Sequence, residues 1–116
     1  MTLPLTKEVI AAAYDYLCEL PPFSEWNLPS SEDIKFKIIK SKDRTAHYCH
    51  SKGVHEIAIS SAYVGEHIML LSSLAHEMTH LHTQRTCWNR RNPHDATFQA
   101  YADQICLIHN FDRLTF

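Results

Sequence analysis

Glycine is nearly absent from this chain of 116 residues, which contains only Gly53 and Gly65. Phosphate-cradling loops of the P-loop and dinucleotide-binding types need several glycines close together, so the sequence excludes both. An excess of positive charge is absent as well: the formal net charge is −2, and Arg90-Arg91 is the one pair of adjacent basic residues. Because nucleic-acid-binding surfaces are usually basic, the charge does not favour a nucleic-acid partner.

Long apolar runs are also missing, since no stretch approaches the ~18 residues of a membrane-spanning helix. The first residues include a proline and acidic side chains where an export signal would carry basic and then apolar ones. The four cysteines form no C-x-x-C pair, so we expect reduced thiols. We therefore expect a soluble, cytoplasmic protein without a membrane partner, folded as one domain over residues 1–116.

The first half of the chain predicts one helix followed by three strands. The helix should begin after Thr6 as its N-cap and end before Pro21-Pro22. Its apolar residues at helical spacing are Val9, Ala13, Tyr16 and Leu20. Strands are expected at 34–40, 45–50 and 54–60, in hairpin connection, which gives a small antiparallel or mixed sheet. Lys35, Lys37 and Lys40 would form a solvated face of the first strand.

The second half predicts two helices. The first covers about residues 66–84. The second should have Asn92 as its N-cap, Pro93 at its first position and Asp95 in its first turn, and should run to about His109. The order helix, three strands, helix, helix indicates an α+β domain.

The helix expected at 66–84 is apolar around most of its circumference and carries one narrow polar stripe. The members of this stripe are Ser72, Ser73, His76, His80 and Thr83, with Glu77 at its border. Residues 76–80 read H-E-x-x-H, in which the two histidines lie one turn apart on the same face and can bind one Zn²⁺ ion. Glu77 then lies beside the ion, where it can accept a proton from zinc-bound water.

A catalytic zinc site usually has three protein ligands, so a third is expected further along the chain. The apolar stripe of the last helix contains Phe98, Tyr101, Ile105 and Ile108. His94 falls on that inward stripe and Asp103 on the outward face, so His94 is favoured as the third ligand, with Asp95, Asp103 and His109 as alternatives. His82 points away from His80 and is not expected to join the same ion.

With these residues in place, the chain resembles the SprT-like zinc metallopeptidases, the family that includes the Spartan proteases. The resemblance rests on H-E-x-x-H at 76–80, on the step to His94, and on His94-x-x-x-Phe98; the segment 48–64 is similar to the family's strands before the active helix. It implies a zincin-like α+β fold, with His76, His80 and His94 as zinc ligands and Glu77 as the catalytic acid/base. Asp95 replaces the glycine that usually follows the third histidine.

The expected activity is hydrolysis of peptide bonds in a protein or peptide substrate, which would lie extended along a sheet edge. Zinc and one further donor would stabilise the oxyanion, and Tyr63, Tyr101 and His109 are candidates for that donor. Two alternatives remain at this stage. One is a non-catalytic zinc protein that captures a partner; the other is a site-specific protease resembling ImmA, in which Asp95 or Asp103 completes the metal site.

Overall fold

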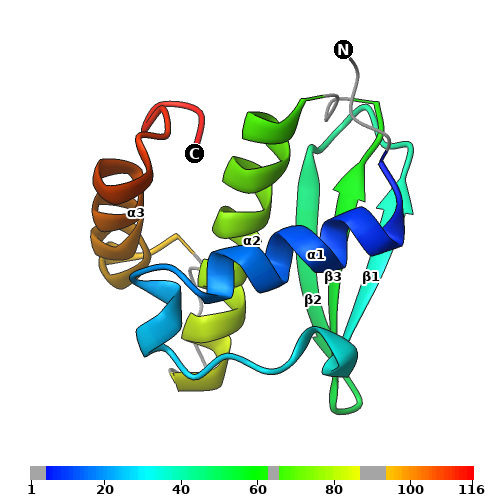
Figure 1. Cartoon of the computed structure of the whole chain (residues 1–116), viewed down its shortest axis with the longest axis horizontal. Helices are drawn as coiled ribbons and strands as arrows, with labels where there is room; N and C mark the ends of the chain where they lie inside the picture. Colours follow the sequence, from blue (N-terminus) through cyan, green and yellow to red (C-terminus); the bar gives the residue numbers. More distant parts are fainter. Residues whose placement is uncertain (1–4, 63–65, 87–93) are drawn as a thin grey trace.

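The computed structural model describes residues 5–62, 66–86 and 94–116, with side chains as far as residue 83 in the middle segment. The elements are α1 (Lys7–Cys18), β1 (Ile34–Ile39), β2 (Ala46–Ser51), β3 (Val54–Ser60), α2 (His67–Thr86) and α3 (Ala96–His109). In Figure 1, α2 stands between the sheet and α3, and α1 crosses in front of it. The α+β class and the small three-stranded sheet are confirmed. No helix in these segments is both long and apolar enough to cross a bilayer.

The sheet is mixed, and its strand order is β1-β3-β2. β2 and β3 form the expected hairpin, in which Ser51 pairs with Val54. The two turn residues between them, Lys52 and Gly53, both have positive φ (52° and 78°), as a tight hairpin turn of the type favoured by strand twist requires. β1, in contrast, pairs with β3 in parallel, in the register Ile34 to His55.

The expected hairpin between β1 and β2 is therefore wrong, because β3 lies between them. Burial gives the physical reason. Residues Ile57–Ser60 of β3 are all buried, so this strand gains most from neighbours on both edges. β2 becomes progressively exposed toward its end and is suited to the edge of the sheet.

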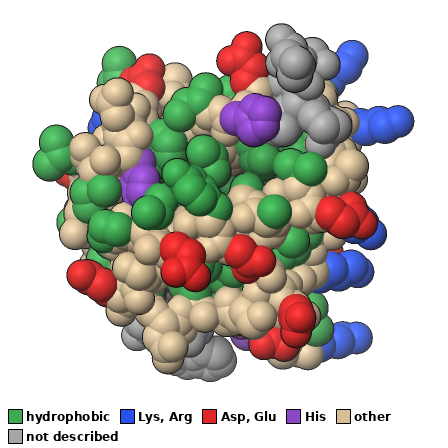
Figure 2. Space-filling view, in the orientation of Figure 1, with side chains coloured by type: hydrophobic (Ala, Val, Ile, Leu, Met, Phe, Trp, Pro, Cys, Tyr) green, Lys and Arg blue, Asp and Glu red, His purple; other side chains and the backbone are tan. Residues whose placement is uncertain are grey.

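The outer face of the sheet is charged, as the alternation in β1 predicts. Lys35 and Lys37 are exposed, whereas Ile34 and Phe36 between them point into the core. Figure 2 shows Lys and Arg side chains along the margin of the molecule on which β1 lies in Figure 1. These lysines form the expected solvated strand face.

α1 begins as predicted but turns a different side to the core. The Thr6 hydroxyl accepts a hydrogen bond from the Val9 amide at 3.1 Å, which caps the helix. The buried residues are Ile10, Tyr14 and Leu17, whereas Tyr16 of the predicted stripe is 57% exposed. Tyr14 also donates its hydroxyl to the Pro29 carbonyl at 2.6 Å, a tertiary contact that helps to fix this orientation.

α2 is the central element of the core. Its fully buried side chains Leu74, Met78 and Leu81 pack in one cluster with residues of α1, β3 and α3. Burying a leucine of this kind stabilises the fold by about 2 kcal/mol through removal of apolar surface from water. From Leu70 onward the apolar side of the helix is packed against these elements, and this packing fixes the positions of His76 and His80 on the polar stripe.

α3 begins later than predicted. Its N-cap is Asp95, whose Oδ1 accepts from the Phe98 amide at 3.1 Å, and the first helical residue is Ala96. Asp95 is thus not in the first turn, and His94 precedes the helix instead of belonging to it. The expected N-cap Asn92 and Pro93 lie outside the described residues.

Candidate metal centre

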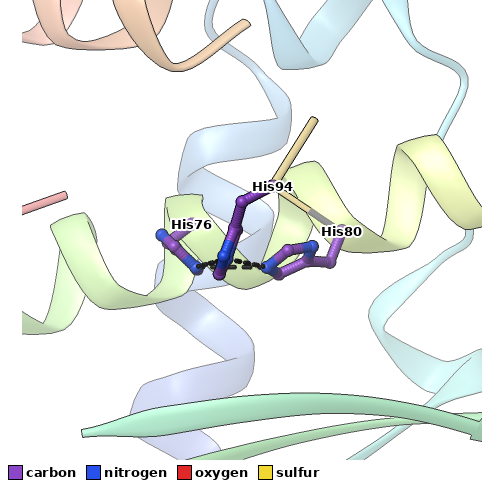
Figure 3. A group of neighbouring side chains, drawn as sticks. All are labelled: His76, His80 and His94. Carbon is purple, nitrogen blue, oxygen red and sulfur yellow. Dashed lines mark hydrogen bonds between the residues drawn. The ribbon is translucent and has the colours of Figure 1, made fainter. Parts of the chain in front are cut away.

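Three histidine rings from two segments of the chain converge beside α2 (Figure 3). His76 and His80 lie one turn apart on α2, and their Nε2 atoms are 3.1 Å apart. His94 comes from the segment just before α3, and its Nε2 lies 3.1 Å from that of His80 and 3.3 Å from that of His76. Within residues 5–62, 66–83 and 94–116, this is the one group of three potential metal ligands.

The spacing of these nitrogens fits a tetrahedral ion. Zn–N bonds of about 2.0–2.1 Å place two nitrogens of a regular tetrahedron ~3.3–3.4 Å apart. The observed separations of 3.1, 3.1 and 3.3 Å are close to that value. Three imidazoles whose ring nitrogens meet at one point can hold a shared cation, whereas mutual hydrogen bonds would require a donor and an acceptor at every contact.

The tautomer of His76 is fixed by a backbone group. Its Nδ1 lies 2.7 Å from the carbonyl oxygen of Phe116, which can only accept, so Nδ1 carries the proton and donates. Nε2 therefore keeps its lone pair for a metal. A carbonyl partner of this kind is the usual outer-shell support of a metal-binding histidine. The sequence gives no sign that residue 116 returns to α2; the left-handed C-cap of α3 at Asn110 (φ 59°) reverses the chain toward it.

Phe98 supplies an apolar wall that all three histidines share. Its ring, which is 2% exposed, lies 5.0, 4.6 and 4.8 Å from the centroids of His76, His80 and His94. Burial lowers the pKa of His76 to about 4, and burial together with the neighbouring imidazoles lowers the pKa of His80 to about 3. Both rings are thus neutral near pH 7, which is the form that binds metal ions.

Glu77 is buried next to this cluster, with 6% of its surface exposed. Burial raises the pKa of its carboxyl to about 8, and the positive charge of Arg44 opposes this shift. It lines two cavities. One, of about 250 Å³, contains His76, His80 and His94 together with Ala46, His47 and Tyr48 of β2; the other, of about 220 Å³, lies on the side of Ser72 and Ser73.

β2 is one of the two edge strands of the sheet, and its first residues line the cavity that contains the three histidines. The backbone of an edge strand offers unpaired N–H and C=O groups to an incoming chain.

The alternative third ligands lie elsewhere. Asp95 caps α3, and Asp103 is an exposed residue whose Oδ1 accepts from Arg113 Nε at 2.7 Å. His109 Nε2 lies 2.7 Å from the Pro21 carbonyl, and the ring stacks on Phe111. None of these side chains belongs to the cluster at His94, so the structure brings together the favoured set and none of the alternatives.

Two of the three expected oxyanion donors lie outside the cavities beside Glu77. Tyr101 packs against Trp26 and His82, and neither Tyr101 nor His109 lines the cavities beside Glu77. Both side chains instead contact residues outside these cavities, and Tyr63 lies outside the described residues and stays a prediction. His82 stacks on Trp26 with ring centroids 4.2 Å apart, away from the cluster, as its position on the helix predicts.

Comparison with known proteins adds one finding. The model of the SprT-like family matches residues 19–113, which includes all three histidines, Glu77 and Phe98. No match is found among curated proteins, and none among solved structures. Since the family model covers most of its length, the chain belongs to the SprT-like family.

Proposed function

We propose that the protein is a zinc-dependent metallopeptidase that hydrolyses peptide bonds in an extended segment of a protein or peptide. His76, His80 and His94 would hold the ion, and Glu77 would be the catalytic acid/base. The observation that carries the proposal is the convergence of three Nε2 atoms at tetrahedral spacing beside a buried carboxyl. Family membership supports it, since SprT-like domains are typically metal-dependent.

The metal ion and the side chains of the protein would have separate roles in the reaction. Zinc, when bound, is a Lewis acid that lowers the pKa of a coordinated water from ~15.7 to about 7. Glu77 accepts the proton of the attacking water and passes it to the leaving nitrogen. Burial raises the pKa of Glu77 in the metal-free chain, and a nearby cation would lower it again, so that the carboxylate can accept a proton near neutral pH. Phe98 packs against all three histidine rings and covers one side of the cluster, and β2 aligns the substrate backbone.

A zinc protein that captures a partner without cleaving it is the rival function, and one substitution separates the two. Glu77→Gln preserves the size of the side chain but removes the base. We expect cleavage of casein to fall about 10²–10⁴-fold, the range for loss of a general base, while zinc content by elemental analysis is unchanged. A chelator should abolish the parent's activity. Exposed Glu25 gives a matched control, since Glu25→Gln should cleave like the parent.

Two results would contradict the proposal. Cleavage by Glu77→Gln at the parental rate would remove the carboxyl from the mechanism. Absence of cleavage by the zinc-loaded parent, with zinc bound at one equivalent, would favour the capture function. The ImmA-like alternative, in which Asp95 or Asp103 completes the metal site, is not favoured. The Asp95 carboxylate caps α3, and the Asp103 carboxylate pairs with Arg113.

A further inference from the structure

The polar stripe of α2 contains two serines that are not part of the metal centre. Ser72 and Ser73 lie about one turn before His76, and both are partly exposed. They line the cavity of about 220 Å³ that also contains His76 and Glu77. Serine has a lower helix propensity than alanine or leucine. Two successive serines on the helix face that carries His76 and Glu77 therefore indicate a role for their hydroxyl groups.

Four of the eight residues that line this cavity, which we name the hydroxyl pocket, carry hydroxyl groups, and the Thr115 hydroxyl donates to the Asp112 carbonyl. Its lining residues are Thr45, Ala46, Ser72, Ser73, His76, Glu77, Thr115 and Phe116. Apart from Glu77, none of them is a charged side chain. The pocket is bordered by the start of β2 and by the C-terminal segment, whose Phe116 carbonyl lies 2.7 Å from His76 Nδ1.

The two serine hydroxyls are available to a ligand. Other hydroxyls on α2 are used within the helix: Thr79 donates to the Ala75 carbonyl at 2.8 Å and Thr83 to the His80 carbonyl at 3.2 Å. Among the residues that the structure describes, no such bond engages Ser72 or Ser73. A hydroxyl that is covered by a ligand without receiving a hydrogen-bond partner loses its hydration, so the binding of an apolar side chain in this pocket is penalised.

The charge of Glu77 further restricts which substrate side chains the hydroxyl pocket can bind. A carboxylate would be repelled by Glu77, which lines the same pocket. A cationic side chain would pair with Glu77 and remove the base that the reaction needs. An uncharged side chain with its own donor and acceptor satisfies the serine and threonine hydroxyls without disturbing Glu77.

The pocket also lies next to the proposed reaction centre. It shares Ala46, His76 and Glu77 with the cavity that holds the three histidines. A peptide extended along β2 over the histidines would therefore place the side chain beside its scissile bond in the hydroxyl pocket.

We propose that the hydroxyl pocket binds a small uncharged polar side chain of the substrate, such as serine, threonine or asparagine, next to the bond that is cut. This inference rests on the proposed peptidase function and assigns to it a substrate class. Ser72 and Ser73 are its specificity-determining residues; they take no part in the proton transfers.

The test measures binding, so that it does not depend on turnover. Peptidyl hydroxamates, which anchor to zinc, are titrated into the zinc-loaded protein in two series, with the varied side chain on either side of the hydroxamate. In one series we expect serine, threonine and asparagine to bind at least ~10-fold more tightly than leucine, phenylalanine, lysine or aspartate, since a site built for hydrogen bonds rejects ligands that leave it unpaired.

The double variant Ser72→Ala/Ser73→Ala should lose this preference and keep the parental zinc content; alanine also has the higher helix propensity, so the helix is preserved. Ser24→Ala, at an exposed serine outside α2, is the matched control and should keep the preference. Equal binding of all side chains, tightest binding of leucine or lysine, or a preference that survives the double substitution would each overturn the hydroxyl pocket while leaving the peptidase intact. Failure of every hydroxamate to bind would instead refute the metal centre, and the inference with it.

Discussion

Replacement of His94 by alanine tests the geometry of the metal centre most directly, because this residue alone joins the centre from outside α2. Its Nε2 lies 3.1 and 3.3 Å from those of His80 and His76, so the substitution removes one corner of the triangle. The other two histidines should keep their positions, since they stand on a buried helix and contact Phe98.

The size of the effect follows from the energetics of zinc sites. Four-ligand structural sites bind zinc with about 10–16 kcal/mol, or about 3 kcal/mol for each ligand, which corresponds to ~100-fold in Kd. His94 is exposed, so water can occupy its place and limit the loss. We therefore expect the zinc Kd of His94→Ala to rise by up to about 100-fold, measured by competition with a chromophoric chelator.

Two control variants make this result specific. Asp103→Ala and His109→Ala remove the rival ligands, and both should bind zinc like the parent, because Asp103 pairs with Arg113 and His109 contacts the Pro21 carbonyl. An unchanged Kd for His94→Ala, or an equal loss for Asp103→Ala, would refute the assignment of the third ligand.

Two further predictions concern stability. Asp95→Ala removes the N-cap of α3 and should lower the free energy of unfolding in urea by about 1 kcal/mol while leaving one zinc bound; loss of the zinc would make Asp95 a ligand. When a chelator has removed the metal, the free energy of unfolding should be greatest near pH 6.5. The lowered pKa values of His76 and His80 (about 4 and 3, from 6.5) mean that the unfolded chain binds protons first, so stability falls as the pH drops below 6.5. The raised pKa of Glu77 (about 8, from 4.5) has the opposite sign and lowers stability as the pH rises toward 8. Thermal unfolding at several pH values checks both arms; Glu77→Gln should lose the alkaline decline, and a decline that persists in this variant would contradict its cause.

The sequence by itself determined the part of the centre that depends on helix periodicity. His76 and His80 are four residues apart, so any regular helix places them on one face, with Glu77 at its border. The position of His82 away from the cluster follows from the same rule. The hairpin turn at Lys52-Gly53 and the Thr6 cap are also local, since each depends on the conformation of a few neighbouring residues.

Only the tertiary structure decided the contacts between distant segments. Two rows of α1, one through Tyr16 and one through Tyr14, have helical spacing, and packing against the sheet and α2 selected the row of Tyr14. The pairing of β1 with β3 could be predicted only by knowing which strand is most deeply buried. The carbonyl of Phe116 reaches His76 across 40 positions of the chain, and a backbone group carries no signature in a sequence. Local periodicity set two ligands, and long-range packing placed the third ligand, its orienting carbonyl and the pocket beside them.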